Sequence, residues 1–192
     1  MRFKEFKTYI DSDLYRYYGR LGLPTFLKAY LKEAGFKYTF WMRFAEYLHQ
    51  KPLTRYTLYI LAKYWHYRLG YKFGISIPIG TDIGPGLYIG HFGTIVLNGG
   101  VELGSNCNLS QGVTIGQSNR GKYSGVPTIG SGVYFGPGSK IVGNINIGDN
   151  AVIGANAVVI TNIENNGVYG GIPAIKISNN GNTGYVDNIL KS

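Results

Sequence analysis

The chain has 192 residues, enough for one domain with an appended segment, and its single cysteine, Cys107, excludes an internal disulfide. The net charge is +9 without any nucleic-acid-binding motif, so we expect no nucleic acid partner. An anionic membrane, a phosphate-bearing ligand or a merely solvated basic surface would account for the charge. Neither a signal peptide nor a run of about 20 apolar residues is evident, so we expect a cytoplasmic protein that touches the inner face of the membrane at most peripherally.

Residues 1–72 predict an α-helical N-terminal region of three or four amphipathic helices rich in aromatic and basic residues. We expect helices over 11–19, 25–34, 38–49 and 55–69, with Gly35 ending the second. Two roles are open for this region. It can cap the sheet edge that follows and pack between subunits, or it can lie on a membrane with Tyr and Trp at the interface and Lys and Arg on lipid phosphates.

A six-residue repeat organises the chain from Ile75 to Ile163. A large apolar residue recurs at every sixth position, and in the last part these residues are Ile129, Phe135, Ile141, Ile147, Ile153 and Val159. This period fits neither an α-helix nor an ordinary strand, and it indicates a parallel β-helix of hexapeptide repeats. The predicted fold class is therefore an all-β solenoid over residues 73–177 that follows the helical region. Residues 178–192 are expected to be a flexible tail with a short helical end at 186–190.

The repeat is interrupted twice. Its phase slips by two residues just after His91, and residues 117–126 form a glycine-rich, basic excursion. Loops on a rigid scaffold commonly carry functional sites, so we look for function at these two places. A merely mobile surface loop is the alternative for the excursion.

At these interruptions the sequence resembles the left-handed β-helix acyltransferases of the serine acetyltransferase type. It is most similar to their branch linked to capsule and exopolysaccharide O-acetylation. The resemblance covers about residues 73–175 and implies a left-handed coil, a homotrimer with sites between subunits, and acetyl-CoA as the co-substrate. The stretches that carry it include Gly90-His-Phe-Gly, Gly112-Val-Thr-Ile-Gly-Gln, Arg120-Gly-Lys and Gly125-Val-Pro-Thr-Ile-Gly.

His91 is the candidate catalytic residue. It is the one histidine within the repeats, and imidazole titrates near pH 6.5, so it can accept the proton of an acceptor hydroxyl. The resemblance implies the same role, because the matching histidine of the family is the general base. The group that orients His91 is open between a backbone carbonyl, Asp82 and Asn98. An exposed corner histidine without a catalytic role is the alternative.

The resemblance also suggests where acetyl-CoA and the acceptor bind. We expect Tyr88 and Asn98 near the acceptor, and no metal site. The candidate coenzyme-binding residues are Arg120, Lys122, Gly136, Ser139, Ala155 and Lys176.

Two departures from the family pattern bear on the acceptor. Ser76 stands where the serine enzymes carry an orienting carboxylate, and Val126 stands where they carry a second histidine. These departures favour an acetyl-CoA-dependent O-acetyltransferase that acts on a sugar hydroxyl of a capsular or exopolysaccharide repeat unit or its precursor. Serine O-acetyltransferase and a non-catalytic β-helix scaffold are the alternatives.

Overall fold

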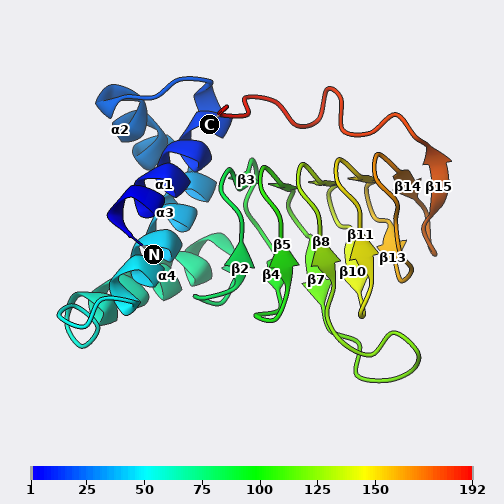
Figure 1. Cartoon of the computed structure of the whole chain (residues 1–192), viewed down its shortest axis with the longest axis horizontal. Helices are drawn as coiled ribbons and strands as arrows, with labels where there is room; N and C mark the ends of the chain where they lie inside the picture. Colours follow the sequence, from blue (N-terminus) through cyan, green and yellow to red (C-terminus); the bar gives the residue numbers. More distant parts are fainter. Residues whose placement is uncertain (1, 192) are drawn as a thin grey trace.

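The computed structural model describes residues 2–191 and places a bundle of helices at one end of a coil of short strands (Figure 1). Met1 and Ser192, the outer ends of the expected helical region and tail, lie outside the described residues. The helices are α1 (Phe3–Tyr18), α2 (Leu23–Lys32), α3 (Ala34–His49) and α4 (Leu58–Phe73).

The expectation that Gly35 ends a helix is wrong, because Gly35 lies inside α3. The chain breaks instead at Glu33, whose backbone is extended with φ −99° and ψ 106°. A β-carbon on Gly35 would lie 2.1 Å from the carbonyl oxygen of Ile89 and 2.6 Å from the Tyr17 hydroxyl. Glycine therefore allows α3 to approach the coil directly, and this use of glycine is not visible in a local pattern.

The buried face of α4 contains only part of the apolar residues at helical spacing. Leu58, Leu61 and Trp65 have this spacing, but each is more than two-fifths exposed. The buried positions are instead Ala62, His66, Leu69 and Phe73. Most of the apolar surface of α4 thus faces away from the core.

Within residues 2–191, fifteen strands of two to four residues follow the helices. They form three sheets, here called A, B and C, and the chain visits the sheets in turn. Sheet A contains β1 (Ile75–Ser76), β4 (Ile95–Leu97), β7 (Thr114–Gly116), β10 (Lys140–Val142) and β13 (Val158–Val159). Sheet B contains β2 (Asp82–Ile83), β5 (Glu102–Leu103), β8 (Thr128–Ile129) and β11 (Asn146–Ile147). Sheet C contains β3 (Tyr88–Ile89), β6 (Asn108–Leu109), β9 (Tyr134–Phe135), β12 (Val152–Ile153), β14 (Val168–Gly170) and β15 (Ile175–Ser178).

The pairing fits the predicted hexapeptide coil. Neighbouring strands are parallel except for β14 and β15, and in sheet B the inward side chains of Ile83, Leu103, Ile129 and Ile147 stack in register. Each of these four side chains is at most 3% exposed, so the ladder forms a dry core. The left hand of the coil stays a prediction.

The two-residue slip lies in the turn between β3 and β4, which carries His91. Ile75 pairs with Ile95, twenty residues further on, whereas Val96 pairs with Thr114 after the usual eighteen. The turn over residues 90–94 is therefore longer than the corresponding turns of the later coils. It includes Thr94 with φ +53°, an unusual conformation for a β-branched residue.

The residues after β15 do not form the expected flexible tail with a helical end. They run along sheet C back to α1 (Figure 1) without helical structure at 186–190. The Asn108 side chain donates to the Tyr185 carbonyl at 2.7 Å, and the Arg16 Nε donates to the Asp187 carbonyl at 2.8 Å. These side-chain bonds to the tail's backbone are long-range, so the sequence did not predict them.

A buried ion pair fixes the helices to the coil. Asp13 of α1 and Arg43 of α3 are 0% and 1% exposed, with Arg43 Nε 3.3 Å from Asp13 Oδ2. Asp13 Oδ1 also accepts hydrogen bonds from the Gly86 and Leu87 amides at 2.8 Å each. Arg43 donates through its other nitrogens to the carbonyl oxygens of Ile83 and Gly84. Both charges are therefore satisfied by the first coil.

Replacing Arg43 with Met should lower the free energy of unfolding by roughly 3–5 kcal/mol, because the Asp13 carboxylate would stay buried without its counter-charge. Urea denaturation followed by circular dichroism measures this. The exposed Arg68, changed to Met, is the matched control and should alter stability by less than about 0.5 kcal/mol. Equal effects of the two changes would contradict the anchoring role.

Candidate active site

His91 lies on the long turn between β3 and β4 and is exposed. Within residues 2–191 its ring makes no hydrogen bond or ion pair, so Asp82 and Asn98, the side chains considered as its orienting partners, do not contact it. The Asn98 Oδ1 accepts instead from the Gly100 amide at 2.9 Å. Phe92 holds the turn against the end of α4, with ring centres of Phe92 and Phe73 5.3 Å apart.

The turns from sheet C to sheet A stack along one edge of the coil. We call this the His91 edge, made of residues 90–94, 110–113, 136–139 and 154–157. Backbone hydrogen bonds of 2.8–2.9 Å join each turn to the next, from Gly112 N to Gly93 O, from Gly138 N to Gln111 O and from Asn156 N to Pro137 O. The structure thus brings His91 and the expected coenzyme residues Gly136, Ser139 and Ala155 to a single edge.

These three residues are not equivalent on that edge. Ala155 is exposed, whereas Ser139 is 0% exposed and its buried hydroxyl has no partner within residues 2–191. A β-carbon on Gly136 would lie 2.7 Å from the Ala155 amide nitrogen, so stacking of the turns alone requires glycine there. The main chain of Ser139 is also engaged, since its amide donates to the Gly136 carbonyl and its carbonyl accepts from the Thr114 amide. The coenzyme-binding roles of Ser139 and Gly136 stay predictions.

Loop 117–126 leaves from the opposite edge of sheet A, in the turn between β7 and β8 (Figure 1). Its base is a short antiparallel pair, with Ser118 and Gly125 exchanging two backbone hydrogen bonds of 2.9 Å. The Tyr123 carbonyl also accepts from the Asn144 amide at 2.9 Å. The side chains of Arg120 and Lys122 are exposed on this anchored loop, and Asn98 lies on the same edge. One chain alone therefore does not join these residues to the His91 edge.

Lys176 on β15, expected to bind the coenzyme, is paired with a carboxylate of its own chain. Its ammonium forms an ion pair with Glu164, and the Tyr169 hydroxyl donates to the same carboxylate at 2.5 Å. The hydrogen bond from Lys176, and then that from Tyr169, lowers the pKa of Glu164 to about 2. A coenzyme phosphate would have to compete with this carboxylate for Lys176.

Tyr88 packs beneath α1. Its ring centre lies 4.7 Å from that of Tyr17, and burial raises its pKa. A β-carbon on Gly90 would come within 3.0 Å of the Tyr88 ring, so the ring borders the turn that carries His91. Its use in acceptor binding stays a prediction.

The sequence analysis missed Lys140. This half-buried residue on β10 extends its ammonium to the Gly112 carbonyl, which places a positive charge beside the His91 edge. A lysine at an outward position of a hexad was the available signal. Within residues 2–191 no group of three or more His, Cys, Asp or Glu is placed to hold a metal ion.

Comparison with known proteins identifies the class of fold. Residues 127–161 match the family described as bacterial transferase hexapeptide (six repeats). A serine acetyltransferase of Helicobacter pylori is 35% identical over 121 residues, which cover 63% of this chain and 68% of that protein. A serine acetyltransferase of Synechococcus elongatus is 37% identical over 110 residues, covering 56% of this chain and 44% of that protein.

Solved structures agree with the sequence matches. Neisseria gonorrhoeae serine acetyltransferase in complex with serine has a TM-score of 0.73 and 28% identity, covering 92% of this chain and 70% of that one. Brucella abortus serine acetyltransferase in complex with coenzyme A has a TM-score of 0.76 and 27% identity, covering 92% and 69%. The protein is a hexapeptide-repeat acyltransferase. It belongs to the serine acetyltransferase family.

The prediction of a sugar acceptor is wrong on this comparison, because the similar proteins and structures described above are named serine acetyltransferases. The capsule and exopolysaccharide branch likewise finds no support in them. The similarity over the rest of the chain outweighs the two departures at Ser76 and Val126.

Proposed function

We propose that this protein transfers an acetyl group from acetyl-CoA to the hydroxyl of serine. The observation that carries the proposal is the His91 edge, where an exposed histidine shares one line of stacked turns with Gly136 and Ala155 in a chain of this family. The similar structures in complex with serine and with coenzyme A support both substrates.

In this mechanism His91 removes the serine hydroxyl proton as the oxygen attacks the thioester carbonyl carbon. An alcohol is a weak nucleophile at neutral pH, so the step needs a base whose pKa lies near the working pH. Collapse of the tetrahedral intermediate breaks the carbon–sulfur bond, and the imidazolium returns its proton to the departing CoA thiolate. Backbone amides of the turns are suited to stabilise the developing oxyanion.

The proposed coenzyme path follows the His91 edge. The main chain at Gly136 and Ala155 faces the pantetheine arm, and Lys140 supplies a positive charge beside them. Arg120 and Lys122 reach the coenzyme from a neighbouring copy, since in their own chain they lie on the other edge of sheet A.

The direct test of the acceptor is thiol release from acetyl-CoA in the presence of free L-serine. We expect saturable release that depends on serine. Binding of coenzyme A with no serine-dependent release would overturn the proposed acceptor and leave the acyltransferase fold unaffected.

Replacing His91 with Ala should lower kcat by roughly 10²–10⁴-fold, which is typical for loss of a general base. Coenzyme A affinity and the melting temperature should change little, because the side chain is exposed and makes no bond within residues 2–191. His49→Ala is the matched control, an exposed histidine at the end of α3, and should keep full activity. Loss of folding in His91→Ala would instead indicate a structural role.

We propose a homotrimer, as the family resemblance implies, and the separation of the two edges supports a site shared between copies. A ring of copies closes when the loop edge of one chain meets the His91 edge of the next, and each chain then contributes to two sites. Light scattering at micromolar concentration should give three times the chain mass of 21.2 kDa. A monomer with full activity would refute this arrangement.

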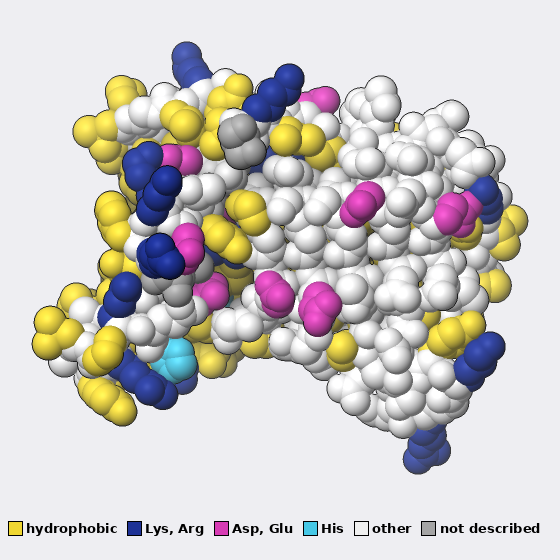
Figure 2. Space-filling view, in the orientation of Figure 1, with side chains coloured by type: hydrophobic (Ala, Val, Ile, Leu, Met, Phe, Trp, Pro, Cys, Tyr) yellow, Lys and Arg dark blue, Asp and Glu magenta, His cyan; other side chains and the backbone are white. Residues whose placement is uncertain are grey.

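We also propose peripheral membrane contact through the helical end. Figure 2 shows hydrophobic and basic side chains gathered over the helices, while the visible face of the coil is mainly neutral with a few acidic groups. The α2 side chains of Leu23, Leu27 and Leu31 are 70%, 50% and 73% exposed, one helical turn apart, and Lys28 and Lys32 accompany them. No helix within residues 2–191 is long and apolar enough to cross a bilayer.

Vesicles containing phosphatidylglycerol should therefore carry the protein in flotation at about 50 mM salt and release it by about 300 mM, because screening weakens attraction of about 1 kcal/mol per basic side chain. Leu31→Ser should reduce flotation several-fold. Ile172→Ser is the matched control, since Ile172 is 75% exposed near the other end of the coil. If neither the salt concentration nor Leu31→Ser changed the amount of protein that floats, the proposed contact would be contradicted.

A further inference from the structure

The turn that carries His91 has little hydrogen bonding of its own. In the part of the chain that the structure describes, the backbone of Gly90, His91 and Phe92 makes no hydrogen bond. Gly136 occupies the place of Gly90 two coils later, and its amide donates to the Ile153 carbonyl at 2.8 Å. The position of the His91 imidazole therefore depends on the groups that hold the two ends of this stretch.

Helix α1 holds the entry to the stretch through the Tyr17 hydroxyl. β3 is the edge strand of sheet C, so one of its sides has no neighbouring strand. On that side the Tyr17 hydroxyl donates to the Ile89 carbonyl at 3.1 Å and accepts from the Ile89 amide at 3.3 Å. Burial raises the pKa of Tyr17 well above its usual range, so the hydroxyl keeps the proton that it donates. Tyr17 thus takes the place of a neighbouring strand two residues before His91.

The ring of Tyr17 is held by its own packing. Its centre lies 4.7 Å from that of Tyr88 and 5.9 Å from that of Phe36 on α3. A ring packed against two others leaves its hydroxyl little freedom to move. The ring contacts do not involve the hydroxyl, so a change from tyrosine to phenylalanine removes the bonds to Ile89 and keeps the packing.

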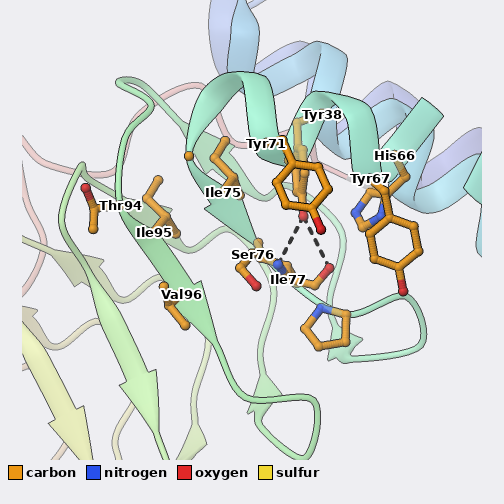
Figure 3. Close-up of a pocket in the computed structure, with 13 residues that line it drawn as sticks. Tyr38, His66, Tyr67, Tyr71, Ile75, Ser76, Ile77, Thr94, Ile95 and Val96 are labelled. Carbon is orange, nitrogen blue, oxygen red and sulfur yellow. Dashed lines mark hydrogen bonds between the residues drawn. The ribbon is translucent and has the colours of Figure 1, made fainter. Parts of the chain in front are cut away.

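Helix α4 holds the exit from the stretch. The Ile95 amide donates to the Gly74 carbonyl at 3.0 Å, directly after α4, and the Phe92 ring packs on Phe73. The exit also borders a cavity of about 490 Å³ between α4 and sheet A. The lining of this cavity includes His66, Ser76 and Thr94 (Figure 3). Because Thr94 belongs to the turn that carries His91, the cavity is part of the proposed acetyl-transfer site.

We infer that Tyr17 is a positioning residue for His91, because its hydroxyl fixes Ile89 and thereby the place of the imidazole beside the acceptor hydroxyl. This role rests on the proposed acetyl transfer, in which His91 is the general base. Protection of the sheet edge alone is the competing explanation, since Tyr38 makes the same pair of bonds to Ile77 beside β1 (Figure 3). Edge protection alone would leave the position of His91 unchanged when the Tyr17 hydroxyl is removed.

The first readout is the NMR signal of the His91 ring in full-length protein labelled at histidine Cε1, recorded without substrates. The chain has three histidines, so His49 and His66 supply the other two signals. In Tyr17→Phe the His91 signal should shift or broaden, while that of His49 stays in place. An unmoved His91 signal in Tyr17→Phe would overturn the positioning role, whatever the acceptor.

The second readout is the rate of acetyl transfer. Tyr17→Phe should lower kcat by about 10–100-fold, since a displacement of about 1 Å in a reacting group costs up to about 10²-fold. The KM for acetyl-CoA and the affinity for coenzyme A should stay within about twofold, because only the proton transfer is disturbed. Circular dichroism and light scattering establish that the variant keeps its fold and assembly.

Tyr18→Phe is the matched control for both readouts. It is the same change at the next position of α1, but the Tyr18 hydroxyl donates to Glu33 at 2.6 Å and not to the coil. It should leave both kcat and the His91 signal unchanged. Equal effects of the two changes would overturn the role of Tyr17. No serine-dependent thiol release from the unchanged protein would instead overturn the proposed function, and the NMR signal would still decide on Tyr17.

Hydrogen exchange tests the same bond in the unchanged protein. The Ile89 amide should exchange at least about 10³-fold more slowly than in an unstructured chain, because it donates to a buried hydroxyl. An Ile89 amide without protection would overturn the bond to Tyr17, even if Tyr17→Phe did not fold.

Discussion

The Asp13 carboxylate is the constraint on which the arrangement of this molecule depends. A fully buried carboxylate is costly unless its oxygens are satisfied, and here they meet Arg43 and the amides of Gly86 and Leu87. These partners come from α3 and from the first coil. The helices therefore have one position that satisfies the charge, and this position also determines where α4 lies above sheet A.

The same placement solves the problem of an open sheet edge. β1 is the edge strand of sheet A, and an unprotected edge invites pairing with other chains. The Tyr38 hydroxyl bonds to both polar backbone groups of Ile77, and Gly70 lets α4 approach the Ile75 carbonyl. At the far end, the antiparallel strand β15 covers β14. Both ends of the coil are closed by elements outside the repeat.

The coil was predictable because every hexad repeats the same inward position. Ile83, Leu103 and Ile129, for example, occupy equivalent buried positions in successive coils. The unusual turn at His91 was predictable as a break in that phase. The boundary at Gly35 and the packed tail were not predictable, since each depends on partners more than 50 residues away along the chain. The buried side of α4 depends on its packing against α3, which the pattern of α4 alone does not show. The place of His66 in the lining of a cavity was not predictable either, because the sequence of its helix is an ordinary aromatic one.

The acceptor prediction failed for a related physical reason. Ser76 replaces a carboxylate expected to orient His91, but an orienting group adds to the action of a general base and does not replace it. In this structure Ser76 lines the cavity under α4, while the stacked turns hold the His91 edge through backbone bonds in which neither Ser76 nor Val126 takes part. Two altered side chains therefore leave the base and the proposed coenzyme path in place. The acceptor is better judged from the whole coil than from these positions.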